Sequence, residues 1–312
     1  MPINAPATLK ELSDYYAKKQ PHQVDTLTEE TPILARLKFE QASHGLWNTA
    51  ESVSDVQGAG LVEMNSPLPK VGMATKLEKI DLNIFGGEIE VPEDTAQMYG
   101  GKEKYFARKM PTILRESGMG TEKTLYYKNY LGYSLATKDR ALNANGTASG
   151  AAKTGLYTII ALRQVSGENI GLYSPEGFKQ GAMFDTKPIN GGNLYKNEKG
   201  VLVYGARLKS YLGWQILNPN TVGAIVNINE DNLPTKIQVN RLLANVRATP
   251  ASTMLFMHPV LRDAMLNVYK DDAMQVTPAT KDLNYLITHW NGIEIVSSYN
   301  ISDGNEKQYT PK

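Results

Sequence analysis

Residues 102–140 read KEKYFARKMPTILRESGMGTEKTLYYKNYLGYSLATKDR, and this stretch sets the architecture of the chain. Its apolar residues recur with the period of an α-helix: Phe106, Met110, Ile113 and Leu114, then Tyr127, Leu131 and Leu135. The pattern predicts one long helix. We expect Pro111 to kink it and Gly118-Met119-Gly120 to interrupt it, because proline and glycine weaken helix interiors.

This stretch is also basic. Residues 101–140 hold nine lysines and arginines against four acids, a local charge of +5, and the rest of the chain carries −4. The whole chain of 312 residues has 33 basic and 32 acidic residues and a net charge of +1. A dedicated nucleic-acid-binding protein has a strong basic excess, so bulk charge argues against that class.

Strands precede the helix. Residues 79–91 alternate between apolar and polar side chains, which predicts strands. Residues 46–71 are small and polar, with Gly58-Ala59-Gly60 at a plausible tip, and weak alternation on either side predicts a long two-stranded hairpin. An isolated hairpin with so few large apolar residues is marginal in water. We therefore expect another chain to cover it.

The first 45 residues look like an arm outside the core. They contain four prolines and two short helical patterns, at residues 8–19 and 32–41. Thr8 and Glu11 have the spacing of a capping box at the start of the first pattern.

After the long helix, residues 141–153 form a small-residue stretch that predicts a flexible loop. Two helices follow, over 235–247 and 259–270, with Pro259 as a first helical residue and His258 before it. The expected strands are Leu156–Arg163, Ile170–Tyr173, Val201–Leu217, Thr221–Ile228, Thr253–Met257, Tyr285–Trp290 and Ile293–Val296. Their irregular alternation with helices predicts an α+β fold.

No catalytic, cofactor-binding or metal-binding residue can be assigned. The chain has no cysteine, and its four histidines (His22, His44, His258 and His289) lie too far apart for a metal motif. In the stretch 146–154 the lysine comes too late for a phosphate loop.

Glu88 and Glu90 would share one strand face, which leaves open a cytosolic α+β enzyme that acts through carboxylates. We expect no membrane span and no secretory signal, and therefore a cytosolic chain.

The order of these elements resembles the major capsid proteins of tailed bacteriophages with the Hong Kong 97-type fold. Three segments carry the resemblance. Residues 157–177 look like the strand, turn and Gly-Leu-Tyr segment of short-tailed phages; residues 204–229, with Leu212-Gly213-Trp214, resemble the return from the axial domain; and residues 290–296 are similar to a C-terminal Gly-Ile-Pro-Val segment.

The resemblance implies a domain order. Residues 1–45 would be the N-terminal arm, 46–78 the E-loop hairpin, and 79–154 a peripheral domain whose spine is the long helix. Residues 155–203 would be the first part of an axial domain, 204–232 strands of the peripheral domain, and 233–312 the second part of the axial domain with the C-terminus.

It also implies a function. Such a chain is no enzyme; it assembles with itself into pentamers and hexamers of an icosahedral virion shell around double-stranded DNA, built in the host bacterial cytoplasm. The implied partners are a separate scaffolding protein, a portal, packaged DNA and a decoration protein. Some members join a lysine to a neighbour's asparagine; Lys70 or Lys76 and Asn218 or Asn220 would fill those roles, but we expect no crosslink. A nanocompartment shell of the same fold stays open as an alternative.

Overall fold

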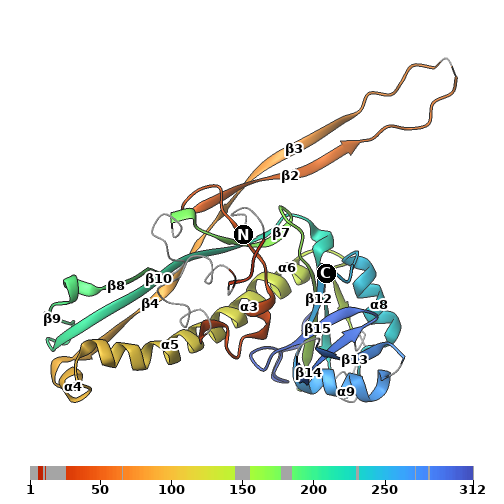
Figure 1. The fold of residues 1–312 in the computed structure, drawn as a ribbon. Helices are drawn as coiled ribbons and strands as arrows, with labels where there is room; N and C mark the ends of the chain where they lie inside the picture. The colour runs from red at the N-terminus through yellow and green to blue at the C-terminus, as the bar shows by residue number, and fades with distance from the viewer. Residues whose placement is uncertain are drawn as a thin grey trace.

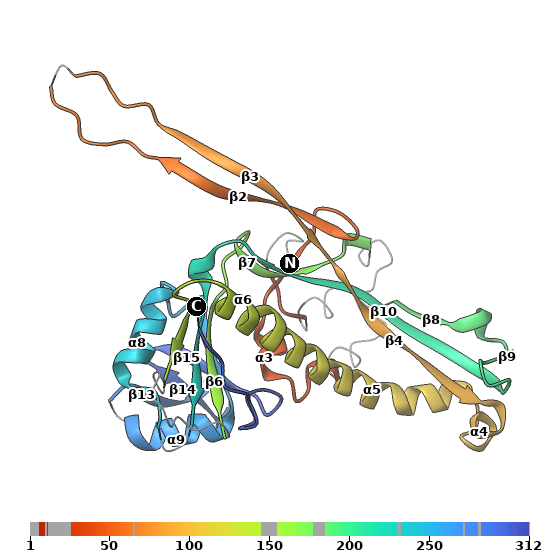
Figure 2. The ribbon, with the colours of Figure 1, turned by 180° about the vertical axis from the view of Figure 1, so that it is seen from behind.

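The computed structural model describes residues 6–9, 11, 26–64, 66–144, 155–176, 185–229, 232–270, 272–279 and 282–311. The molecule is elongated (Figures 1 and 2). A hairpin of β2 (Trp47–Gln57) and β3 (Gly72–Asp81) projects from one end, and a long sheet with a long helix runs to the other. A compact sheet with helices lies to the side. Within the described residues, no helix is both long and apolar enough to cross a membrane.

The compact part is built on a seven-stranded sheet in the order β13-β14-β15-β12-β6-β11-β5. Its strands are β5 (Ala141–Asn143), β6 (Tyr157–Arg163), β11 (Val222–Ile228), β12 (Thr253–Met257), β13 (Met274–Ala279), β14 (Asp282–Trp290) and β15 (Ile293–Ser297). Helices α8 (Lys236–Asn245) and α9 (Pro259–Tyr269) pack on one face. The sequence predicted both helices and all of these strands except β5 and β13.

Strand β6 shows why this sheet is a middle layer. Ile159 and Ala161 belong to the apolar cluster under α8 and α9, whereas Ile160 and Leu162 belong to the cluster that includes the long helix. A strand buried on both faces needs apolar residues at successive positions, which is what the segment Tyr157–Arg163 supplies.

The long helix, which we call the spine helix, spans residues 102–136 as α5 (Lys102–Thr124), the π-helical segment η1 (Leu125–Leu131) and α6 (Gly132–Ala136). The expected interruption at Gly118-Met119-Gly120 was wrong, and Pro111 lies inside α5. The helix continues through these glycines because one side of it is buried along its whole length. The buried residues are Met110, Leu114, Gly118, Glu122, Tyr126, Tyr130 and Ser134. Gly118 lies where the N-terminal segment crosses: a Cβ there would meet the Leu27 carbonyl oxygen at 2.3 Å.

The irregularity falls instead in η1. There Leu125, Tyr126, Tyr130 and Leu131 are all buried. The Tyr126 hydroxyl donates to the Thr158 carbonyl of β6 at 2.8 Å, and the Tyr130 ring packs against Phe256 of β12. The wider π turn, with its i→i+5 hydrogen bonds, lets residues five apart, Leu125 with Tyr130 and Tyr126 with Leu131, be buried together.

The elongated part is a six-stranded sheet in which β1-β7-β10-β4 are consecutive and β8 and β9 also pair with β10. The strands are β1 (Phe39–Gln41), β4 (Asn83–Pro92), β7 (Asn169–Tyr173), β8 (Asp185–Pro188), β9 (Tyr195–Lys196) and β10 (Leu202–Ile216). The short helix η2 (Ile189–Gly192) connects β8 to β9, α4 (Glu93–Met98) leads from β4 to the long helix, and η3 (Pro219–Thr221) leads from β10 to β11. Each of the predicted ranges 155–203 and 204–232 therefore contains strands of both sheets. The division into domains stays a prediction.

Part of the expected arm belongs to the core. Ala7, Leu9, Leu27, Ile33, Leu34, Leu37 and Phe39 are buried in the same cluster as the spine helix. The helix expected over 32–41 ends at Arg36 as α3 (Pro32–Arg36), and β1 then pairs in parallel with β7. The capping box of Thr8 and Glu11 is confirmed by two reciprocal hydrogen bonds of 2.8 and 3.2 Å. Most of the first predicted helix lies outside the described residues.

The expected loop over 141–153 begins later than predicted. Ala141–Asn143 form strand β5, which pairs in parallel with β11. Residues 145–154, which include all of the stretch considered for phosphate, lie outside the described residues.

Glu122 is a fully buried carboxylate where three segments meet. One oxygen accepts from the backbone N–H groups of Ile33 and Leu34, both at 3.1 Å; the other accepts from the Ser298 hydroxyl and, at 3.1 Å, from the Asn300 amide. Burial raises the pKa of Glu122, and these hydrogen bonds oppose the shift. The carboxylate thus ties the start of α3 and the C-terminal segment to the spine helix.

Gly118→Ala tests the close crossing of Leu27 over the spine helix. We expect a loss of about 1–3 kcal/mol of stability, because the new methyl group overlaps a backbone carbonyl that cannot rotate away. The matched control is Gly120→Ala, two residues away, whose Cβ meets nothing within 4 Å. Helix propensity alone should make that control more stable by up to about 1 kcal/mol. Denaturant unfolding of the full chain measures both, and equal effects would contradict the crossing.

Candidate assembly interface

The hairpin is the least covered part of the molecule. Leu61, Met64 and Leu68 in the connection between β2 and β3 are 109%, 92% and 84% exposed. Further exposed apolar side chains follow along both strands: Val53, Val56, Val71, Met73 and Leu77. Figures 1 and 2 show why, because the distal hairpin extends away from the body with nothing beside it. A concentration of exposed apolar residues on one element marks an interaction surface.

The base of the hairpin, in contrast, is fixed. The Asn48 amide donates to Gln215 Oε1 of β10 at 2.7 Å, and the Gln215 amide donates to the Gly167 carbonyl at 2.5 Å. Leu82, just after β3, is buried in a small cluster with Ala42, Ile170 and Leu172. The hairpin is therefore held at its base and projects from a rigid body.

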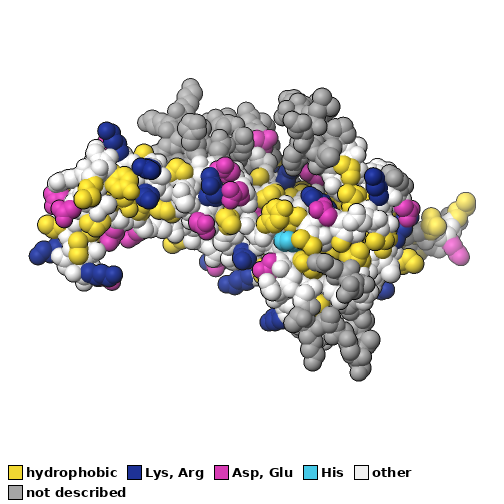
Figure 3. All heavy atoms as spheres, turned by 90° about the horizontal axis from the view of Figure 1, so that it is seen from below, with side chains coloured by type: hydrophobic (Ala, Val, Ile, Leu, Met, Phe, Trp, Pro, Cys, Tyr) yellow, Lys and Arg dark blue, Asp and Glu magenta, His cyan; other side chains and the backbone are white. Residues whose placement is uncertain are grey.

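The spine helix presents a moderate surplus of positive charge. Three basic residues of the stretch 101–140 are used within the subunit. Arg115 pairs with Glu29 at 2.6 Å, Arg140 donates to the Asn245 carbonyl at 2.7 Å, and Lys102 donates to the Gly192 carbonyl at 2.5 Å. The exposed basic residues are Lys104, Arg108, Lys109, Lys123, Lys128 and Lys138; the exposed acids between 101 and 140 are Glu103, Glu116 and Asp139. On the face shown in Figure 3, Lys and Arg side chains are interspersed with acidic and hydrophobic ones rather than gathered in one patch.

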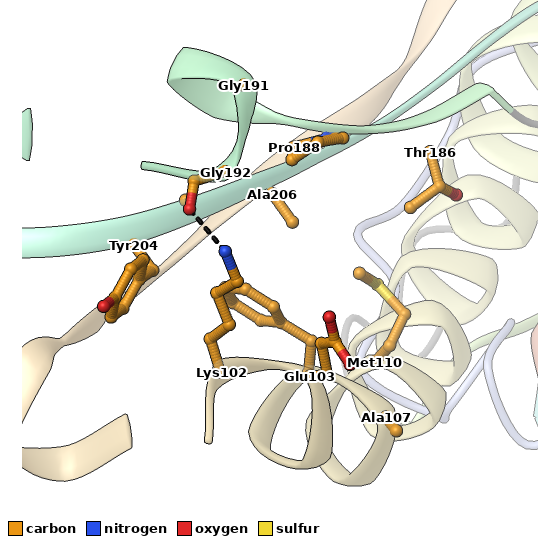
Figure 4. Close-up of a pocket in the computed structure, with 12 residues that line it drawn as sticks. Lys102, Glu103, Ala107, Met110, Thr186, Pro188, Gly191, Gly192, Tyr204 and Ala206 are labelled. Atoms are coloured by element: carbon orange, nitrogen blue, oxygen red, sulfur yellow. Dashed lines mark hydrogen bonds between the residues drawn. The ribbon is translucent and has the colours of Figure 1, made fainter. Parts of the chain in front are cut away.

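A hollow of about 490 Å³ opens between the start of the spine helix and β10. Its walls include Phe106 and Met110 from α5 and Tyr204 from β10. Figure 4 shows Lys102 reaching from α5 to the Gly192 carbonyl, and its ammonium lies 5.0 Å from the centre of the Tyr204 ring.

The acid pair considered for catalysis does not line this hollow. Glu88 and Glu90 are exposed on β4, and Glu90 accepts from the Tyr195 hydroxyl at 2.8 Å and the Asn197 amide at 3.3 Å. Burial and the nearby Glu90 raise the pKa of Tyr195 to about 12. These contacts fasten β9 at the end of the sheet.

The histidines have separate structural surroundings. His44 stacks on Trp47 at 3.6 Å, and His289 Nδ1 lies 3.1 Å from the Thr277 hydroxyl. His258 Nδ1 accepts from the Val260 N–H at 3.2 Å, which confirms it as the start of α9. His22 lies outside the described residues. In the part of the chain that the structure describes, no group of three His, Asp or Glu residues is placed to hold a metal.

The asparagines considered for a crosslink are engaged within their own subunit. Asn218 donates to Glu168 at 2.7 Å and accepts from the Asn220 N–H at 2.9 Å, and Asn220 also accepts from Arg140. Lys76 lies 3.6 Å from Glu78. The absence of a crosslink stays a prediction.

Comparison with known proteins gives a result at the level of structure. No family model and no curated protein matches the sequence. A structure of bacteriophage Epsilon15 matches with a TM-score of 0.56 and 11% identity, over 87% of both chains. The capsid of bacteriophage JBD30 matches with a TM-score of 0.53 and 11% identity, over 84% of this chain and 88% of that one.

The chain has a bacteriophage capsid fold. This confirms the predicted α+β class and the resemblance to phage capsid proteins; the short tail stays a prediction. The SrpI encapsulin of Synechococcus elongatus also matches, with a TM-score of 0.46 and 12% identity, over 72% of this chain and 96% of that one.

Sequence reasoning located the hairpin of this capsid fold but missed its anchor. Asn48 and Gln215 are 167 residues apart, and neither belongs to a motif. The one signal in the sequence is that Gln215 interrupts an otherwise apolar stretch of β10. The structure shows that its side chain is only 2% exposed.

Gln215→Ala tests the anchor. The substitution leaves the Asn48 amide without its acceptor, so we expect the base of the hairpin to lose about 1–3 kcal/mol of local stability. Hydrogen exchange of residues 43–50 should rise accordingly. Gln57→Ala, at the exposed far end of β2, is the control and should leave exchange at the base unchanged. Unchanged exchange in both variants would rule out the anchor.

Proposed function

We propose that this chain is a major capsid protein that assembles with itself into a closed icosahedral shell. The observation that carries the proposal is the hairpin, which is anchored at its base and bears exposed apolar side chains along its length. Burial of a leucine or methionine side chain contributes about 1.5–3 kcal/mol. Covering Leu61, Met64 and Leu68 together therefore supplies a substantial part of the free energy of an intersubunit contact.

The hairpin has the reach to make such a contact. The 11 residues of β2 extend about 35 Å at the rise of a β-strand, before the connection at residues 58–71 is counted. In the proposed assembly the E-loop, residues 46–78, lies on the adjacent subunit. Residues 79–154 and 204–232 form the peripheral domain, and residues 155–203 and 233–312 the axial domain at the centre of pentamers and hexamers. The arm, residues 1–45, contributes a further contact in addition to its buried contacts within the subunit.

Removal of residues 46–76 tests the assembly role. We expect a folded subunit that forms no shells, because its core is intact while the proposed contact is gone. A milder variant changes only Leu61, Met64 and Leu68 to serine, with Glu63→Ser as a control at the same tip. Electron microscopy of material made with scaffolding protein should show closed shells for the control and none for the apolar variants. Shells formed by the triple variant, or a strictly monomeric wild type, would count against the proposal.

The proposed content of the shell is the double-stranded DNA genome. The exposed surplus of lysine and arginine on the spine helix supports a weak contact with phosphates that reads no sequence. A separate scaffolding protein, a portal and a decoration protein are the proposed partners in the host cytoplasm, and the virion is the final location. The mixed charges in Figure 3 suit a protein cargo equally well, so a nanocompartment is the second candidate.

The content of native particles distinguishes the two. We expect particles treated with nuclease to retain double-stranded DNA, and we expect terminase and portal genes beside the gene for this chain. Particles that contain a protein cargo and no protected DNA would identify a nanocompartment.

A further inference from the structure

The C-terminal segment contains a second buried carboxylate, with surroundings unlike those of Glu122. Glu306 is 7% exposed and accepts from the Thr158 hydroxyl of β6 through Oε2. Its other oxygen, Oε1, is buried and has no hydrogen-bond partner among the described residues. A buried carboxylate with one unpartnered oxygen is costly when it is ionised.

Within the part of the chain that the structure describes, the groups that face Glu306 add no positive charge. From the C-terminal segment, the Asp303 carboxylate and the Tyr309 ring face it; from η1, Tyr126 and Tyr127; and from β6, Thr158. Lys307 is the adjacent residue, but it is exposed and its ammonium lies 5.9 Å from the centre of the Tyr309 ring. Burial raises the pKa of Glu306 above its ordinary value, the hydroxyl groups of Thr158, Tyr127 and Ser302 oppose the shift, and Asp303 adds a smaller increase.

Residues 301–309 connect two layers of the subunit around this group. The Ser302 N–H donates to the Tyr127 hydroxyl of the spine helix at 2.7 Å, and the Ser302 hydroxyl accepts from the Thr158 N–H at 2.5 Å. Further along, Tyr309 and Asn227 of β11 exchange two hydrogen bonds of 2.8 Å. The segment therefore holds the spine helix to the seven-stranded sheet.

We propose that residues 301–309 form a proton-controlled clasp, closed while Glu306 is neutral and opened when Glu306 loses its proton. The clasp belongs to the folded subunit and does not depend on the proposed shell function. Ionisation places a negative charge in a buried site beside Asp303, and release of the segment lets water reach it. The spine helix and the sheet then lose a shared contact and gain freedom to shift relative to each other.

The sign of the pH effect follows from the raised pKa. The stabilising contribution of neutral Glu306 is complete below the pKa of an unfolded glutamate and is lost as pH rises through the raised folded value. His258, which interacts with Asp303, acts in the opposite direction: burial lowers its pKa, so protonation at low pH disfavours the folded state. A loss of protection on raising the pH therefore has the sign expected of a glutamate.

Hydrogen exchange of the full chain between pH 5 and pH 8, corrected for intrinsic exchange rates, tests the clasp. In the wild type, protection of residues 301–311 should fall as pH rises, by about tenfold for each unit by which the pKa is raised. Glu306→Gln should abolish this fall, because its carbonyl can accept from Thr158 while it carries no charge. Asp303→Asn should reduce the fall, because it removes the like charge.

Glu122→Gln is the matched control. Both oxygens of Glu122 accept hydrogen bonds, so the amide group of glutamine faces donors, and the variant should be less stable at every pH while residues 301–311 keep their pH dependence. Equal pH dependence in wild type and Glu306→Gln would overturn the clasp. So would a pH dependence that disappears in Glu122→Gln and persists in Glu306→Gln.

Discussion

The buried carboxylate of Glu122 is the constraint on which the subunit core depends. A carboxylate inside an apolar core must be surrounded by donors, and here those donors come from segments 88 and 178 residues away in sequence. If either segment leaves, the charge loses part of its hydrogen bonding and the cost exceeds that of one neutral hydrogen bond. The spine helix, α3 and the C-terminal segment therefore have to fold together.

The spine helix shows how far periodicity carries a prediction. Its helical character was evident from apolar spacing, which also marked Met110 and Leu114, but the rest of its buried stripe and its continuity through Gly118 were not. Met110, Leu114, Gly118 and Glu122 repeat every four residues, and two of the four are residue types that sequence reasoning assigns to breaks or solvated faces. Gly118 is explained by the chain that crosses it and Glu122 by its distant donors. Such long-range contacts leave no local pattern.

The projecting hairpin was easier to predict because its signal in the sequence is local, namely a shortage of large apolar side chains. Residues 46–71 contain too few large apolar side chains for a stable independent hairpin, and the structure indeed gives the distal part no contact with the body. The N-terminal segment was misjudged by the same reasoning. Ala7, Leu9 and Leu27 are few and scattered, yet each is buried, because the spine helix and sheet already supply the rest of that core.

These observations separate two kinds of stability within one chain. The body is fixed by contacts between distant segments, including the Glu122 junction, the Gln215 anchor and the segment around Glu306. The distal hairpin projects from the body and leaves its apolar side chains exposed. The anchor joins the base of the hairpin directly to β10 of the long sheet. A subunit built in this way can be bound through the hairpin without loss of its own core.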